Sequence, residues 1–164
     1  MIIIFLIVTA SPYIYLNNEK YNNNNADCHK IEITISDDII KIEWNITIFS
    51  TSVMFYNCTD IIEIDMTNFN TSLVTDMSYM FALCNSLTSL NISNFNTAQV
   101  ETMEGMFYNC TELTSLNLES FTNPKVKSLY RMFYNCEKLE YLNIKNFEEK
   151  EGMNLSEDRK STRL

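Results

Sequence analysis

The phrase Met-Phe-Tyr-Asn-Cys occupies residues 54–58, and it returns unchanged at 106–110 and 132–136. A variant, Met-Phe-Ala-Leu-Cys, occupies residues 80–84, so consecutive copies start 26 residues apart. A fixed period in this range is typical of solenoids, in which equivalent units stack and each unit buries its apolar face against the next. The repeat therefore predicts the fold, and it moves the search for function from a pocket to an extended surface.

Each copy contains the pattern of a short helix. Its sixth residue favours a helix N-cap, and apolar residues follow at helical spacing, as in Met77, Met80 and Phe81. The four cap positions are Ser50, Asp76, Thr102 and Ser128. We expect a helix of about two turns that ends near the Cys, and stacking must hold it because isolated helices of that length are marginal in water.

A leucine-rich pattern follows the Cys in each copy. In Leu87-x-x-Leu90-x-Ile92 the last two apolar residues flank a polar one, which predicts a short strand with one buried face. We expect the Phe that closes each unit to join a stacked ladder of Phe69, Phe95, Phe121 and Phe147. The predicted fold is an α/β solenoid of the leucine-rich-repeat type, with one short helix and one short parallel strand per 26-residue coil, in four repeats over residues 45–148.

The segment before the repeats predicts a cap. Residues 30–36 and 37–44 alternate apolar and polar side chains around Asp37-Asp38, a pattern typical of a β-hairpin. The end of a solenoid exposes its apolar core, and an edge module with a polar outer face must cover it. We therefore assign residues 11–44 to a polar lead-in followed by a β-hairpin cap.

The two ends of the chain allow two interpretations each. Residues 1–10 are apolar but too short to span a bilayer, and the small residues up to Ala10 fit a signal-peptide cleavage site. Because no Lys or Arg precedes Lys20, a truncated signal or an apolar lead-in strand is the alternative. Residues 149–164 read as a charged tail, either natively disordered or, over 158–164, the translation of a sequencing adapter, which would make the chain an incomplete one.

Composition argues against several classes of function. The formal net charge of −9 disfavours nucleic acid, since a phosphate-binding face needs clustered Lys and Arg. Two Gly residues are too few for a phosphate-binding glycine loop. The single histidine, His29, lies in a polar segment with no apparent orienting group, as a catalytic base would require. We therefore expect no enzyme activity and no cofactor.

The cysteines of the repeated phrase form a column of equivalent positions: Cys58, Cys84, Cys110 and Cys136. Metal-binding cysteines normally lie two to four residues apart, which disfavours a metal site. Stacked strands lie about 4.8 Å apart, so distance alone does not exclude disulfide bridges between repeats. Equivalent side chains in a stack point in parallel, however, and cysteine is often a buried apolar filler. We therefore interpret the column as structural, with bridges and metal or redox roles as weaker alternatives.

The exposed side of the predicted strands is the candidate binding face. Repeat proteins commonly bind partners across such surfaces, and Tyr141 is the aromatic anchor on this one. The candidate partner-binding residues are Asp65, Asn91, Asn117, Tyr141 and Asn143. Asn-x-Ser/Thr triplets also mark glycosylation acceptors, of which we select Asn45, Asn70 and Asn91. A glycan on Asn91 would obstruct the face.

The stretch Asn-Phe-Asn-Thr-Ser-Leu-Val-Thr-Asp-Met-Ser-Tyr-Met-Phe, residues 68–81, resembles the BspA-like leucine-rich repeats of surface proteins. These are also catalogued as a mycoplasma-lipoprotein-type repeat, and the similarity covers about residues 44–148. The resemblance implies a protein at the cell surface or secreted, because the family occurs on bacterial and protist surfaces and several members are linked to adhesion. We expect a non-enzymatic protein that recognises a protein or glycan ligand. The alternative is an intracellular leucine-rich-repeat scaffold or signalling protein.

Overall fold

The computed structural model describes residues 48–67 and 69–148 in full, and before residue 48 it describes only the backbone of five short strands. The five strands are β1 (Ile2–Phe5), β2 (Tyr13–Leu16), β3 (Glu19–Tyr21), β4 (Lys30–Ile33) and β5 (Ile40–Glu43). Strand β1 lies within residues 1–10, the segment predicted as a signal peptide. A strand there is what the alternative interpretation, an apolar lead-in strand, predicts. The tail predicted at 149–164 lies outside the described residues.

The predicted hairpin is wrong, although both of its strands exist. Strand β4 pairs antiparallel with β1, and β5 pairs antiparallel with β2, which also pairs with β3. The two hairpin strands therefore belong to different sheets. Alternation of apolar and polar residues indicates that a segment is a strand, but it does not select the partner. The apolar segments at residues 2–5 and 13–16 supply the partners instead.

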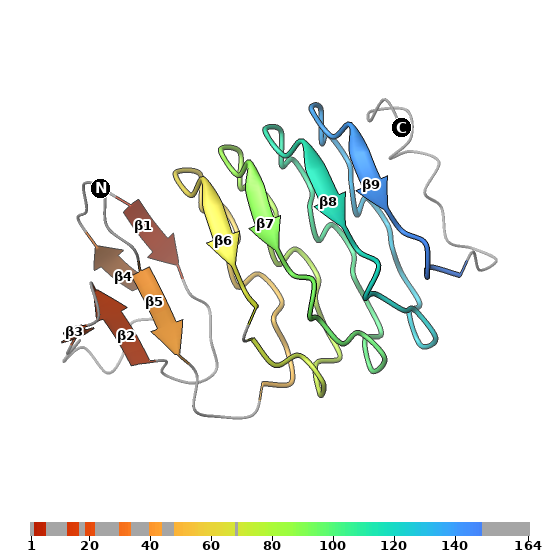
Figure 1. Ribbon diagram of the computed structural model, residues 1–164, viewed down its shortest axis with the longest axis horizontal. Coiled ribbons are helices and arrows are strands. Elements are labelled where there is room, and N and C mark those ends of the chain that lie inside the picture. The colour runs from red at the N-terminus through yellow and green to blue at the C-terminus, as the bar shows by residue number, and fades with distance from the viewer. Residues whose placement is uncertain are drawn as a thin grey trace.

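Four three-residue strands recur in the repeats: β6 (Glu63–Asp65), β7 (Ser89–Asn91), β8 (Ser115–Asn117) and β9 (Tyr141–Asn143). They point the same way and lie side by side in Figure 1. The prediction of parallel strands is confirmed, and the register between paired strands is one repeat, as for Glu63 with Ser89. Their hydrogen bonds form two two-stranded sheets, β6–β7 and β8–β9, rather than one continuous sheet.

The predicted helices are wrong: no helix occurs among residues 48–67 and 69–148. The segments 50–58, 76–84, 102–110 and 128–136, here called the tight segments, are chains of turns. Alternate N–H groups donate to the neighbouring repeat, as Phe81 N does to Met106 O at 2.9 Å. The residues between donate three positions back, as Ala82 N does to Tyr79 O at 3.1 Å. Half of the donors that an α-helix needs are therefore used between repeats.

Backbone conformation explains why the tight segments cannot be helical. Each contains two residues with a left-handed φ, such as Tyr79 at 54° and Leu83 at 63°. A right-handed helix needs negative φ throughout, so these residues interrupt it. The side chains of the predicted cap residues still accept a hydrogen bond from the backbone N–H two residues later, as Asp76 Oδ1 does from Ser78 N at 2.8 Å. This hydrogen bond closes a turn between side chain and backbone. The backbone of Asp76 also forms isolated parallel β-bridges with the equivalent residues Ser50 and Thr102.

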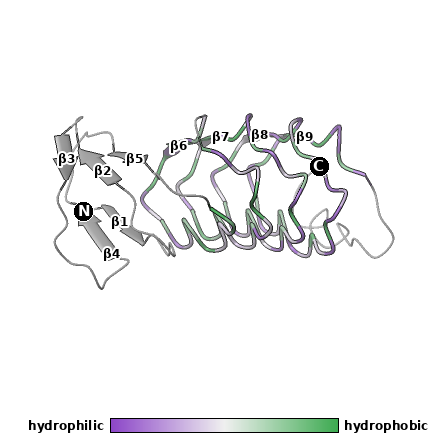
Figure 2. Ribbon diagram, turned by 90° about the horizontal axis from the view of Figure 1, so that it is seen from below, coloured by the Kyte–Doolittle hydropathy of each residue, from purple (hydrophilic) through white to green (hydrophobic). Residues whose placement is uncertain are grey.

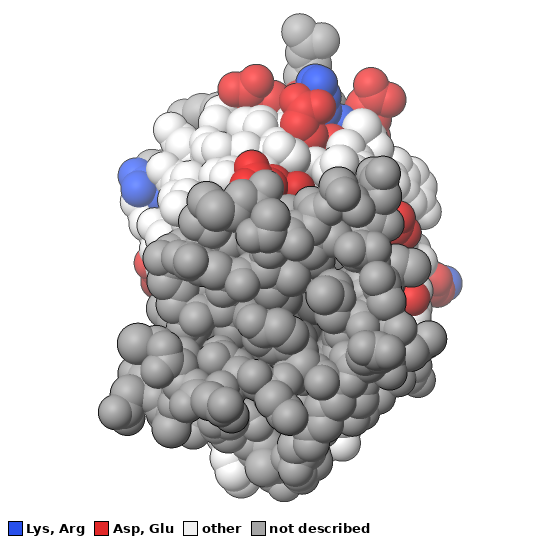
Figure 3. Space-filling model, turned by 90° about the vertical axis from the view of Figure 1, so that its left-hand side faces the viewer, with Lys and Arg blue, Asp and Glu red and all other residues white. Residues whose placement is uncertain are grey.

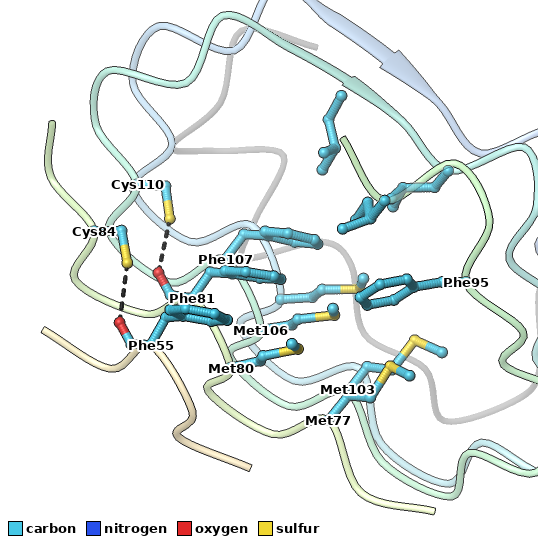
Figure 4. Close-up of a cluster of buried hydrophobic side chains, with 14 of the residues drawn as sticks. Phe55, Met77, Met80, Phe81, Cys84, Phe95, Met103, Met106, Phe107 and Cys110 are labelled. Atoms are coloured by element: carbon cyan, nitrogen blue, oxygen red, sulfur yellow. Dashed lines mark hydrogen bonds between the residues drawn. The ribbon is translucent and has the colours of Figure 1, made fainter. Parts of the chain in front are cut away.

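The core consists of columns of equivalent side chains, which Figure 4 shows from within. The predicted Phe ladder is confirmed, with ring centroids 6.1 Å apart for Phe69–Phe95 and 6.0 Å for Phe95–Phe121. A second ladder runs through the tight segments, where Phe81 and Phe107 stack at 5.7 Å with an interplanar angle of 4°. The strands run along one side of the repeats in Figure 2, and bends of the chain recur along the opposite side.

Buried polar side chains also join the repeats. Thr71, Thr97 and Asn123 occupy equivalent positions, and each is 1% exposed. Thr97 Oγ1 donates to Thr122 O at 2.7 Å and accepts from Thr122 N at 2.8 Å. Each such side chain satisfies both polar groups of a backbone position in the next repeat, so burial leaves no unmade hydrogen bond there.

Candidate recognition surface

The strand face presents the side chains that the sequence predicted. Asp65, Asn91 and Asn117 are exposed, Asn143 is half-buried, and the residue between each flanking pair points inward. Tyr141 is 57% exposed and begins β9, directly beside Ser115 of β8. The structure therefore places all five predicted residues along one face, and Tyr141 is the large aromatic side chain among them.

The Asp/Asn column of this face also ends the strands. Asp65 Oδ1 accepts from Thr67 N at 2.9 Å and from Thr67 Oγ1 at 2.5 Å. Asn91, Asn117 and Asn143 accept in the same way from the N–H two residues on. These are Asx turns, in which a short side chain replaces a backbone acceptor. Sequence reasoning assigned these residues to binding alone and missed their part in the turn.

The hydrogen bonds of Asp65 have an electrostatic consequence. Donation by the Thr67 hydroxyl, and then by the Thr67 backbone, holds the pKa of the Asp65 carboxyl below its usual value. Asn143 Nδ2 donates to Asn117 Oδ1 at 3.0 Å, and Asn91 Nδ2 donates to the Thr67 hydroxyl at 2.8 Å. These polar side chains are thus already fixed by bonds between neighbouring repeats. They would therefore lose little conformational entropy when a ligand binds.

The cysteine column is buried, since Cys58, Cys84, Cys110 and Cys136 are each at most 1% exposed. Cys84 and Cys110 are free thiols. Each donates to a carbonyl of the preceding repeat, Cys84 Sγ to Phe55 O and Cys110 Sγ to Phe81 O, both at 3.1 Å (Figure 4). Burial raises the pKa of Cys84 to about 12 and that of Cys110 well above its usual value. Such thiols lack the thiolate character that nucleophilic or metal chemistry needs.

The glycosylation acceptors differ in their surroundings. Asn45 lies outside the described residues. Asn70 is exposed, and its Oδ1 accepts from Ser72 N at 3.0 Å. Asn91 is also exposed, but its amide nitrogen is the group that donates to Thr67. Because a glycan is attached through that nitrogen, Asn70 is the better acceptor of the two described.

A cluster that the sequence analysis did not single out lies on the tight segments of the second to fourth repeats. We call it the tyrosine patch; it comprises Tyr79, Glu104, Tyr108, Tyr130, Arg131 and Tyr134. The Tyr79 hydroxyl donates to Glu104 Oε1 at 2.7 Å, and this bond is the main reason why the pKa of Tyr79 is raised to about 12. Tyr108 and Tyr134 stack with centroids 5.2 Å apart. The Tyr of the repeated phrase Met-Phe-Tyr-Asn-Cys was the feature of the sequence that could have indicated this cluster.

Charged side chains pair between the last two repeats. Lys127 Nζ lies 2.5 Å from Glu101 Oε2, and Lys138 Nζ lies 2.6 Å from Glu112 Oε2. Both pairs are exposed. The face of the molecule seen in Figure 3 carries acidic and basic groups next to each other at its upper edge. Exposed pairs of this kind contribute little to stability. Within the part of the chain that the structure describes, no helix has the length and apolarity needed to cross a bilayer.

Comparison with known proteins gives one match. No curated protein and no solved structure shows significant similarity to the chain. The family model described as "Mycoplasma protein of unknown function, DUF285" matches residues 48–158. This region contains every column described above and covers more than half of the sequence. The chain therefore belongs to this mycoplasma family of unknown function.

Proposed function

We propose that the chain is a non-enzymatic recognition protein, secreted or held at the cell surface, that binds a protein or glycan ligand through its strand face. The observation that carries the proposal is the exposed Tyr141 among side chains already fixed by neighbours. Tyr anchors supply much of the binding energy at interfaces. The resemblance of residues 68–81 to BspA-like repeats of surface proteins supports the cellular location.

The same proposal includes a solenoid of the BspA-like type. Support comes from the constant register, in which Ser50, Asp76, Thr102 and Ser128 bridge in series. Both Phe ladders follow the same register, as do the cysteine donors. Each repeat therefore contacts mainly its neighbours, as in quasi-one-dimensional repeat proteins.

An intracellular scaffold is the second candidate. The observation that favours it is that Cys84 and Cys110 are free thiols, because reducing compartments keep cysteines in that state. Strand β1 also places residues 2–5 of the apolar N-terminal run within a paired sheet. Burial protects the two thiols in an oxidising compartment as well, so the cell surface remains the first candidate.

Secretion separates the two candidates. The chain, expressed in a eukaryotic host with residues 1–10 retained, should reach the medium or the cell surface. It should also carry a mass that falls on glycosidase treatment. The variant Asn70→Gln should lose part of that shift, whereas Asn94→Gln, which changes an asparagine outside any acceptor triplet, should retain it. Retention of unmodified protein in the cytosol would support the scaffold.

The strand face is tested by photo-crosslinking. A photoreactive phenylalanine at position 141 should capture a partner on intact cells, whereas the same residue at exposed position 73 should not. The captured molecule should then bind purified wild-type chain at least ~10-fold more tightly than Tyr141→Ala, as expected for loss of an aromatic anchor. Unchanged binding by both Tyr141→Ala and Asn117→Ala would show that recognition occurs elsewhere.

A further inference from the structure

Strand β9 leaves one edge of the repeats without a neighbouring strand. It is the last strand of the row in Figure 1, and within the part of the chain that the structure describes only β8 pairs with it. Leu118 N donates to Asn143 O at 2.8 Å, and Tyr141 N donates to Thr114 O at 3.2 Å. Tyr141 and Asn143 therefore face β8. Because alternate residues of a strand direct their N–H and C=O groups to opposite edges, Leu142 presents both of its groups to the open edge.

The apolar core also comes closest to the surface at this edge. Ile144 and Phe147 are half-buried. Their equivalents in the three earlier repeats are buried: Met66, Ile92 and Leu118, and Phe69, Phe95 and Phe121. In the tight segment of the same repeat, by contrast, Met132 and Phe133 are only 0% and 3% exposed. The fourth repeat is thus open on its strand half, and an open strand edge with apolar neighbours is a template for pairing with another chain.

The backbone groups of this edge are arranged symmetrically about Leu142. Glu140 O and Ile144 N occupy the positions of Thr114 O and Leu118 N, which bond to β9 at the preceding interface. Neither Glu140 O nor Ile144 N has a hydrogen-bond partner within the described residues. When two such edges meet antiparallel with Leu142 opposite Leu142, the two leucines exchange both bonds, and each Ile144 N meets a Glu140 O. The edge is therefore complementary to a second copy of itself, as a twofold interface requires.

We propose that two copies of the chain associate end to end through β9, as an antiparallel pair of strands on a twofold axis at Leu142. The pair extends the β8–β9 sheet across the axis and brings together the half-buried Leu142, Ile144 and Phe147 of both copies. Tyr141 then lies opposite Asn143 of the second copy, so the side chains that face each other are uncharged and the two strand faces form one surface. The proposal concerns assembly, and it stands whether or not that surface binds a ligand.

Sedimentation velocity of the purified chain tests the assembly. At ~100 µM, in ~0.5 M NaCl to screen the net charge of −9 on each copy, the chain should sediment as a mixture of monomer and dimer with no larger species. Leu142→Lys places a cation of each copy on the axis, so it should weaken dimerisation at least ~10-fold. Leu73→Lys, which replaces an exposed leucine of the second repeat, should dimerise like the wild type.

Disulfide trapping tests the register, with Cys28→Ser present in every variant. Directly opposite residues of an antiparallel pair have Cα atoms ~4.5–5.5 Å apart, which is within the range of a disulfide. A mixture of Tyr141→Cys and Asn143→Cys chains should therefore form covalent dimer at least ~10-fold faster than either chain alone. Ser115→Cys mixed with Asn117→Cys, the equivalent positions of β8, should form none.

The inference is overturned if the chain remains a monomer under these conditions, or if it forms an open series of larger oligomers, which a head-to-tail contact would give. It is also overturned if folded Leu142→Lys dimerises like the wild type, or if the β8 cysteines cross-link as readily as the β9 cysteines. Circular dichroism establishes whether Leu142→Lys is folded. If that variant does not fold, the cysteine variants alone decide between the two outcomes.

Discussion

At the scale of single residues, Ser120 differs from two of its equivalents in how it bonds to the preceding repeat. Its equivalents Asn94 and Asn146 donate to carbonyls of the preceding repeat, at 3.5 Å to Phe69 O and 2.6 Å to Glu119 O. Ser120 Oγ is buried and lacks a hydrogen-bond partner within the described part of the chain. A buried hydroxyl without a bond lowers stability, and a longer side chain with an amide donor can reach the neighbouring carbonyl.

Ser120→Asn should therefore stabilise the protein. We expect the free energy of unfolding to rise by ~0.5–1.5 kcal/mol, the usual net value of one hydrogen bond. Urea denaturation followed by circular dichroism measures it, and Ser115→Asn on the exposed strand face serves as the matched control, with a change within ~0.5 kcal/mol. Equal or lower stability of Ser120→Asn would mean that the amide cannot enter the column.

Gly105 gives the opposite prediction. Gly105→Ala should lower the free energy of unfolding by ~1–3 kcal/mol, because it combines a positive φ with a collision against the Tyr79 ring. In the background of Tyr79→Ala the same change should cost less, since only the backbone strain remains. A double-mutant cycle measures this coupling. Additive effects of the two substitutions would show that the ring and the added methyl group do not meet.

At the scale of elements, the cysteine column makes the tight segments testable. The thiols of Cys58, Cys84, Cys110 and Cys136 are buried, and the pKa of Cys84 is raised to about 12, so almost no reactive thiolate exists near pH 8. In a Cys28→Ser background, a colour-forming disulfide reagent should find no rapidly reacting thiol in the folded protein and four after denaturation. Rapid reaction in the folded state would show that the column opens to water.

The elements also show what a sequence can and cannot predict. The period, the strands and the Phe69 ladder follow from spacing alone, because stacking places equivalent residues together. The helix was predicted from Met77, Met80 and Phe81, and this apolar spacing suits a chain of three-residue turns just as well. The informative signals were Asn57 and Gly105, residue types that favour positive φ, at positions where a helix would not need them.

The candidate surfaces were predictable to different degrees. The strand face was predicted from alternation around Asn91 and Asn117, although Asn143 is half-buried rather than exposed. The tyrosine patch was not, because it depends on which side chain of a turn points outward and on contacts between repeats, as between Arg131 and Tyr130. Neither follows from periodicity in a segment taken for a helix.

At the scale of the whole molecule, an ion pair between Glu101 and Lys127 links the third repeat to the fourth. Hydrogen bonding by Lys127, and then its positive charge, lowers the pKa of the Glu101 carboxyl below its ordinary value. Folding therefore favours the ionised carboxylate. The stabilisation is fully present above the unfolded pKa and is lost as the pH falls through the lower, folded pKa.

Glu101→Gln should accordingly lower the melting temperature near pH 6 and leave it almost unchanged near pH 3. The comparison of variant with wild type at each pH cancels the titration of the other carboxylates. An equal deficit at both pH values would show that the ion pair contributes nothing and that Glu101 acts only through packing.

The alternation of hydrogen bonds in the tight segments has a mechanical consequence. Alternate N–H groups, such as that of Phe81, point along the stacking direction, so a pull on the two ends loads those bonds lengthwise and one interface at a time. Hydrogen bonds loaded in this way break one interface after another. A chain held in a force-measuring instrument should lengthen in steps of at most ~90 Å, the extended length of one 26-residue unit, and each step should occur at low force.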